Sequence, residues 1–187
     1  MGGEDKGLLC VAGKPLVGWL LEHAAHYSDA LSISANRNLE RYAAFGYPVV
    51  PDADASLGPL SGIATALRLA RRPLLLVLPC DTPFLPPDLV DRLLAALQEE
   101  GADVAVPECD GQIHHAVMVC RASVRTSLPA FLEQDKRRVG EWLATQKTAR
   151  VAFSDPSCFS NLNTPEDLAR AERRLAERPN ADGRARR

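Results

Sequence analysis

The chain has 187 residues, of which 46% are hydrophobic and 25% are charged, a size and composition that fit one globular domain with a well-formed core. We expect this domain to span residues 1–177. The formal net charge of −2 excludes a general attraction to nucleic acid or to anionic membranes, so an anionic ligand would have to be held by local groups.

Cysteine usage and the chain ends indicate the compartment. The five cysteines are scattered, with neither a C-x-x-C pair nor histidines at zinc-ligand spacing, which favours a reduced protein. The sequence shows no apolar signal-peptide core and no apolar run of membrane-spanning length. We therefore expect a cytoplasmic protein with no membrane or nucleic-acid partner. The arginine-rich residues 178–187 predict a disordered basic tail.

Helix-like and strand-like patterns alternate along the first half of the chain. The expected elements are a helix at 15–27, a strand at 31–34, a helix at 38–45, a strand at 47–51, a helix at 62–70 and a strand at 73–79. The last strand contains Leu74 to Leu78, a run without a polar face that is typical of a buried central strand. Pro86 and Pro87 then fit the first turn of a helix with one apolar stripe.

The second half continues the pattern with strands expected at 103–106, 115–120 and 150–153. A final helix is predicted from Thr164, whose hydroxyl can cap it, with Pro165 at its first position and Asp167 at its third. This alternation predicts a three-layer α/β/α domain with a mostly parallel sheet.

Acidic residues follow two of the expected strands. Ligands of open α/β sheets bind beyond the carboxyl ends of the strands, so Asp81 is placed to hold a magnesium ion that bridges phosphates. Capping of the local turn is an equally good explanation for Asp81. Asp52 follows another strand and could bind a nucleotide or order the turn that contains Gly58 and Gly62.

Three further segments carry candidate ligand groups. Lys6 lies in a glycine-rich segment suited to phosphates, although a terminal segment of this kind is more often disordered. Ser34 ends a strand and can form hydrogen bonds with a base or a ribose. Asn161 and Asn163 lie on one side of an extended segment and could both face one ligand, with an Asx turn as the alternative.

The order of these segments is more specific than any one of them. M-G-G-x-D-K-G-L, S-A-N-R, V-P-D, G-P-L-S-G, P-C-D-T-P-F-L-P-P-x-L and N-x-N-T-P-E-D-L follow one another along the chain. From Met1 to about Leu175 this succession resembles the molybdenum cofactor guanylyltransferases, often called MobA proteins. The segments around Asp81 and Asn161 are the most distinctive.

The resemblance implies a nucleotide-diphospho-sugar transferase fold and transfer of GMP from GTP to the phosphate of molybdopterin. It assigns Lys6, Ser34, Asp52 and Asp81 to the nucleotide. Gly58 and Gly62 join this group as glycines that could let the backbone approach a base or ribose. The resemblance assigns Asp81 to Mg²⁺, Lys6 and Asp81 to catalysis, and Asn161 and Asn163 to molybdopterin. Molybdenum insertion proteins and molybdoenzyme chaperones are the candidate protein partners.

Two positions differ from the family pattern. Ser34 stands where family members often have asparagine, and its side chain reaches less far. Met1 falls on a methionine that family members carry after a first strand and an L-A-G-G loop. We therefore expect the native protein to be longer. The alternative functions are a nucleotidyltransferase that uses CTP or a sugar phosphate, and a truncated non-catalytic protein that binds the cofactor.

Overall fold

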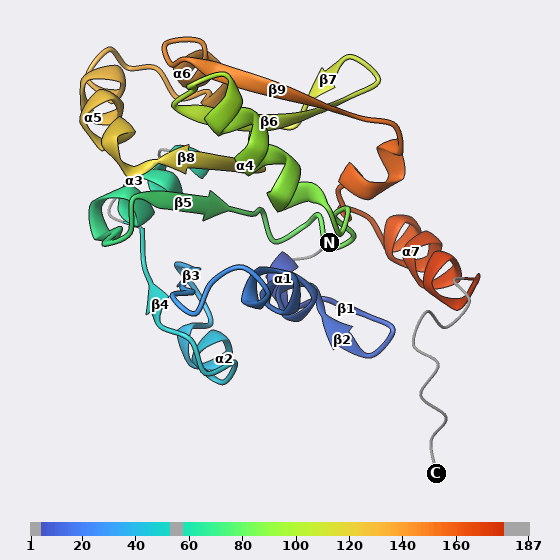
Figure 1. Ribbon diagram of the computed structural model, residues 1–187. Coiled ribbons are helices and arrows are strands. Elements are labelled where there is room, and N and C mark those ends of the chain that lie inside the picture. The colour runs from blue at the N-terminus through green and yellow to red at the C-terminus, as the bar shows by residue number, and fades with distance from the viewer. Residues whose placement is uncertain (1–4, 53–57, 178–187) are drawn as a thin grey trace.

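A computed structural model describes residues 5–52 and 58–177. Its centre is a five-stranded sheet, seen across the upper half of Figure 1. The strands are β5 (Leu74–Val77), β6 (Val104–Cys109), β7 (Gln112–Ile113), β8 (Met118–Arg121) and β9 (Thr148–Phe153). The spatial order is β5-β8-β6-β7, and β9 pairs with the other edge of β6. The predicted tail at 178–187 lies outside the described residues.

The sheet is mixed, whereas the sequence pattern predicted a mostly parallel one. β8 pairs antiparallel with both β5 and β6, so β5 and β6 run in the same direction, and β9 is parallel to β6. The reversal comes from residues 107–118, which contain no helix to carry the chain back. A hairpin joins β6 to β7 through Asp110 and Gly111, both with positive φ, as a tight two-residue turn requires.

Helices cover both faces of this sheet and complete the predicted three layers. On one face α4 (Leu89–Glu99) packs against Ala105 and Val119. On the other face α3 (Pro59–Leu69), α5 (Ser127–Leu132) and α6 (Val139–Leu143) pack against Val104 and Met118. Neighbouring strand residues thus enter opposite cores, because successive side chains of a strand point to opposite faces.

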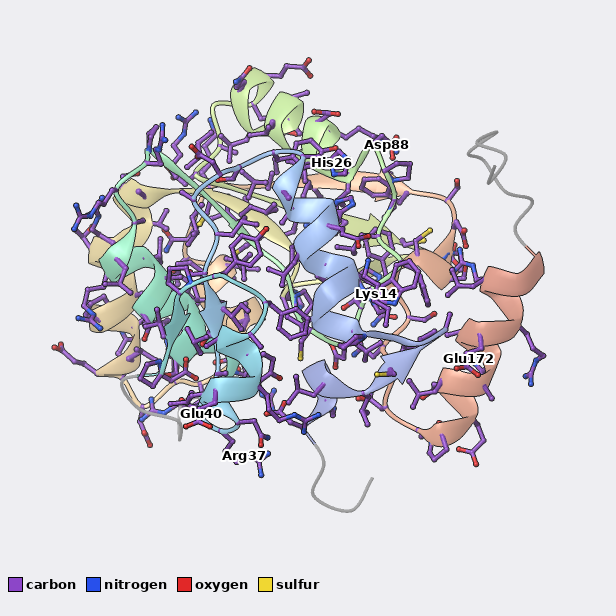
Figure 2. The ribbon with its side chains drawn as sticks, turned by 90° about the horizontal axis from the view of Figure 1, so that it is seen from below. Lys14, His26, Arg37, Glu40, Asp88 and Glu172 are labelled. Carbon is purple, nitrogen blue, oxygen red and sulfur yellow. The ribbon has the colours of Figure 1, made fainter. Side chains whose placement is uncertain are left out.

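Two small sheets lie beside the central one. β3 (Ile33–Ser34) and β4 (Val49–Val50) pair in parallel, and β1 (Cys10–Val11) and β2 (Lys14–Pro15) form a hairpin. Around them stand α1 (Leu16–Ala25), α2 (Leu39–Ala43) and α7 (Pro165–Glu177). Seen from below, α1 lies between α2, which carries Glu40, and α7, which carries Glu172 (Figure 2).

Most predicted elements are present with shifted ends, and several short ones were missed. The predicted 62–70 helix begins earlier, at Pro59, because proline fits the first position of a helix. The missed elements are the β1–β2 hairpin, β7, α5, α6 and the 3-10 helices Lys6–Leu8, Ala122–Thr126 and Pro156–Phe159. Among the described residues, no helix is long and apolar enough to cross a membrane.

The packing of Trp142 gives a test of the core between the central sheet and helices α3, α5 and α6. Its side chain is fully buried, and its indole N–H donates to the Ser127 hydroxyl at 3.1 Å. Trp142→Ala should lower the free energy of unfolding by about 3–5 kcal/mol because it leaves a large cavity. Ser127→Ala is the matched control; it removes the bond from Trp142 and the bond to the Val124 carbonyl, and should cost about 2 kcal/mol, the value of two hydrogen bonds. Urea unfolding followed by circular dichroism measures both; equal losses would contradict this packing.

Candidate active site

Three distant segments meet beyond the end of β5. The Lys6 ammonium lies 3.8 Å from an Asp81 carboxylate oxygen and donates a hydrogen bond to Asn163 Oδ1 at 2.5 Å. Half of the Lys6 side chain and a fifth of the Asp81 side chain are exposed, so a ligand can reach both. The structure therefore brings together one cation, one carboxylate and one amide that the sequence analysis had singled out separately.

The Asp81 and Asn163 segments are fixed to one another through the backbone. The amide of Leu162 donates to the carbonyl of Asp81 at 2.8 Å, and the Leu162 side chain is buried beside Phe84. Asp167 then accepts from the backbone amide of Thr164, while the Thr164 hydroxyl accepts from the amide of Asp167. This is the predicted capping pattern of α7, and it sets the direction in which the asparagine segment enters the helix.

A second cluster lies where β3 and β4 end side by side. The Asp52 carboxylate accepts from the Ser34 hydroxyl at 2.5 Å and from the Asn36 amide at 3.1 Å. The Asn36 side-chain oxygen in turn accepts from the Asp52 backbone at 2.8 Å. A side chain at Gly62 would lie 3.2 Å from the Ser34 hydroxyl, so glycine leaves room for this cluster. Asn36 thus orders Asp52.

The two predicted glycines have different surroundings. Gly62 lies inside the first turns of α3, not in a loop, whereas Gly58 precedes the helix with φ +57°. A side chain on Gly58 would meet no atom within 4 Å, so its backbone conformation, not crowding, favours glycine. Residues 53–57, which join Asp52 to Gly58, lie outside the described ranges.

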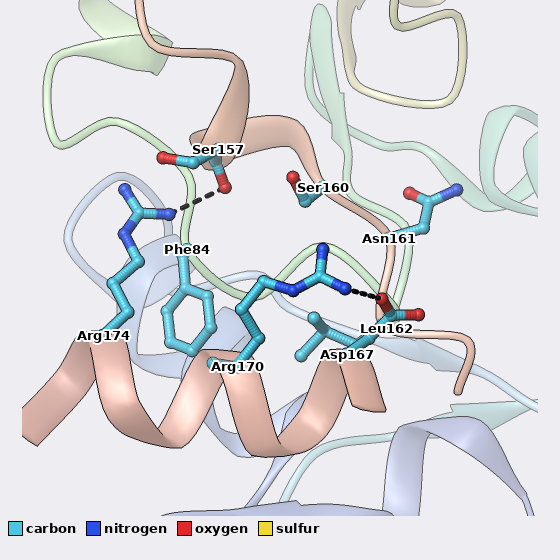
Figure 3. A pocket seen from close by; sticks show the side chains of 9 residues that line it. Phe84, Ser157, Ser160, Asn161, Leu162, Asp167, Arg170 and Arg174 are labelled. Carbon is cyan, nitrogen blue, oxygen red and sulfur yellow. Dashed lines mark hydrogen bonds and ion pairs between the residues drawn. The ribbon is translucent and has the colours of Figure 1, made fainter. Parts of the chain in front are cut away.

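Asn161 faces different surroundings from Asn163. It lines a shallow cavity over α7, and Figure 3 shows its amide on the side of the cavity away from Arg170 and Arg174. The apolar part of the cavity lining consists of Phe84, Leu162 and Ala171. Both arginines form ion pairs within the protein: Arg170 pairs with Asp167, and Arg174 pairs with Asp155.

Electrostatics keep the cysteine of this loop protonated. Desolvation by the surrounding protein and the negative charges of Asp81 and Asp5 raise the pKa of Cys80 to about 11, and Lys6 opposes them. Cys80 is exposed, but its thiol is a poor nucleophile at neutral pH.

Lys6 has a support that its sequence pattern did not predict. The Asp5 carboxylate accepts hydrogen bonds from the Tyr42 hydroxyl at 2.6 Å and from the Asn38 amide at 3.3 Å. An acidic residue directly before the candidate lysine was the available signal for Asp5. Nothing in the sequence marked Tyr42, which reads as one apolar position of a short helix.

This arrangement defines a class of protein. An α/β domain that gathers a lysine, a carboxylate and polar amides at the carboxyl ends of its strands is built to bind a nucleotide or another phosphorylated ligand.

Known proteins identify the family within this class. The family model for the MobA-like NTP transferase domain matches residues 1–151. The molybdenum cofactor guanylyltransferase of Shewanella amazonensis is 42% identical over 95% of this chain and 91% of its own length. That of Shewanella sediminis is 39% identical with the same coverage. The chain belongs to the MobA-like NTP transferase family.

Solved structures show the same fold. The molybdopterin-guanine dinucleotide biosynthesis protein A of Archaeoglobus fulgidus matches with a TM-score of 0.77 and 22% identity, covering 94% of this chain and 93% of its own. The 2-C-methyl-D-erythritol 4-phosphate cytidylyltransferase of Thermus thermophilus matches with a TM-score of 0.72 and 20% identity, covering 91% and 94%. Both support the predicted nucleotidyltransferase fold, and the family assignment confirms the resemblance seen in the sequence.

The pKa of Cys80 tests the charges around Asp81. At pH 8 only about a thousandth of a thiol with a pKa near 11 is ionised, so iodoacetamide should label Cys80 slowly, with a rate that rises up to about pH 11. Asp81→Asn removes one of the negative charges that raise the pKa of Cys80, so it should speed the labelling of Cys80 at pH 8. Asp29→Asn, in an exposed distant pair, should not. Peptide mass spectrometry measures the rates; a plateau below pH 9 would contradict the geometry.

Proposed function

We propose that the protein transfers GMP from GTP to the phosphate of molybdopterin, forming molybdopterin guanine dinucleotide and releasing pyrophosphate. The relatives of about 40% identity, which carry the name molybdenum cofactor guanylyltransferase over nearly the whole chain, support this reaction. The observation that carries it in the structure is the meeting of Lys6, Asp81 and Asn163 at one point.

Asp81 is the proposed ligand of Mg²⁺. Its carboxylate has no partner in the described ranges other than Lys6, which at 3.8 Å leaves the oxygen lone pairs available. No group of three or more histidine, cysteine, aspartate or glutamate side chains among the described residues could hold a metal alone. That fits Mg²⁺, which is commonly held by one or two carboxylates together with substrate phosphates. Bound there, Mg²⁺ would supply charge neutralisation at the triphosphate.

The remaining residues divide between the two substrates. Lys6 would bind the triphosphate as a point charge, and Ser34, Asp52, Gly58 and Gly62 would form the nucleoside side of the site. The Asp52 carboxylate supports this role, because Ser34 and Asn36 fix its direction while each oxygen, with one hydrogen bond from them, keeps a second lone pair for a donor on a base or ribose. Asn161 and Asn163 would face molybdopterin.

The proposed reaction needs no covalent bond between the protein and a substrate. Both reactants are anions, so the residues must neutralise charge and align the acceptor phosphate with the α-phosphate of GTP. No general base is needed, because a phosphate nucleophile is already ionised at neutral pH. Lys6 can contribute both to charge neutralisation and to alignment, since it contacts Asp81, assigned to the nucleotide, and Asn163, assigned to molybdopterin.

The cellular setting follows from the same proposal. The five cysteines are all free, which supports a reducing compartment, and we propose the cytoplasm. Residues 1–177 would act as one domain, and molybdenum insertion proteins or molybdoenzyme chaperones would deliver or receive the cofactor.

Replacement of Asp81 tests the assignment. Asp81→Ala should abolish GMP transfer in a magnesium-dependent assay with GTP and molybdopterin, because the Mg²⁺ that would balance the charge of the triphosphate loses its protein ligand. The circular dichroism spectrum should stay unchanged. Asp29→Ala removes an exposed carboxylate elsewhere and should retain full activity. Turnover by the Asp81 variant at the wild-type rate would overturn the metal assignment.

The structural likeness to cytidylyltransferases favours one rival, a CTP-dependent enzyme. With labelled GTP and equal unlabelled competitor, GTP should reduce incorporation by half and CTP should leave it nearly unchanged. Effective competition by CTP would favour the rival. Molybdopterin binding without any turnover would instead favour a non-catalytic cofactor-binding protein.

A further inference from the structure

The turn that carries Lys6 is short and depends on outside support. It is a three-residue 3-10 helix, Lys6–Leu8, with no side-chain cap of its own. Its backbone is closed by two bonds, from Leu8 to the Asp5 carbonyl and from Leu9 to the Lys6 carbonyl. So short a turn does not fix a long, half-exposed lysine by itself.

The support comes from the segment that contains α2. Tyr42 and Asn38 each donate to a different oxygen of the Asp5 carboxylate, at 2.6 and 3.3 Å. Tyr42 is 4% exposed and packs with Leu8, so the donor is held rigidly under the turn. Burial and the bonded Asp5 carboxylate raise the pKa of Tyr42 far above its usual range, so its phenol remains a donor at every physiological pH.

Contact between the turn and Tyr42 is close. A side chain on Gly7 would lie 2.5 Å from the Tyr42 hydroxyl oxygen, closer than real carbon atoms approach. Gly7 therefore lets the turn sit directly on the tyrosine. The same hydrogen bonds occupy both oxygens of the Asp5 carboxylate, while Lys6 pairs with Asp81.

We propose that Tyr42 is a positioning residue for the triphosphate: through Asp5 it orients the turn that presents Lys6. Tyr42 itself touches neither reacting group. This inference rests on the proposed function only in taking GTP as the ligand. It gives α2, which is distant from Lys6 in the sequence, a role in substrate binding.

The test is Tyr42→Phe, which keeps the ring and removes the hydroxyl. With Mg²⁺ and no acceptor, calorimetric titration should show GTP affinity about tenfold weaker, the effect of one lost hydrogen bond to a charged group. GMP affinity should be unchanged, because GMP lacks the phosphates that Lys6 would meet. In turnover, kcat/KM for GTP should fall by a similar factor. A general loss of structure would weaken GTP and GMP alike.

Matched variants complete the experiment. Tyr47→Phe removes a hydroxyl from a tyrosine packed against the same apolar cluster and should bind GTP as the wild type does. Asp5→Ala should reproduce the effect of Tyr42→Phe, and either change combined with Lys6→Ala should be no worse than Lys6→Ala alone. Asp5→Ala also keeps the test decisive if Tyr42→Phe fails to fold.

Failure of the positioning role and failure of the proposed function give different results. If the wild type binds GTP and both Tyr42→Phe and Asp5→Ala bind it equally well, the positioning role is wrong. Equal weakening of GTP and GMP, or losses that add to that of Lys6→Ala, would also overturn it. If the wild type does not bind GTP at all, the proposed function fails instead.

Discussion

The hydrogen bond from the Leu162 amide to the Asp81 carbonyl joins the two halves of the site. It places the segment before α7 beside the end of β5, and the buried Leu162 and Phe84 side chains fill the space beneath it. Only with these segments held together can one lysine contact both Asp81 and Asn163. The ion pair, the amide contact and the proposed division between two substrates all depend on this backbone contact.

The fold supplies the rigidity that this contact needs. β5 is covered on both faces, because its alternate residues enter the α4 core and the α3 core. Asp81 therefore lies in the turn that follows a strand that cannot rotate without disrupting both cores. The Asp52 cluster is similarly fixed by the parallel β3–β4 pair. Two anionic groups held on separate rigid supports, with a lysine at one of them, suit a ligand that is a base at one end and a polyphosphate at the other.

Sequence reasoning predicted the parts of this arrangement that are local in the chain. The all-apolar run at Leu74 to Leu78 predicted a strand, which is present as β5, and Thr164 and Asp167 predicted the start of α7. The prediction that this strand is buried and central is wrong for the described residues, where β5 pairs with β8 at one edge of the sheet and its residues are half-buried. Sequence reasoning missed features that depend on distant contacts. The reversed direction of β8 follows from a hairpin that leaves little periodic signal, and the pairing of Tyr42 with Asp5 joins residues that no spacing rule connects. Ser34 and Asp52 were singled out separately, but only the parallel pairing of their strands brings them into contact.

The most direct test of the account is a crystal structure of the protein with Mg²⁺ and a non-hydrolysable GTP analogue. The account predicts a metal bound by the Asp81 carboxylate and by phosphate oxygens, at about 2.0–2.1 Å. It also predicts that the Lys6 ammonium contacts the triphosphate. A nucleotide bound elsewhere, or bound here with Asp81 turned away from the metal, would contradict it.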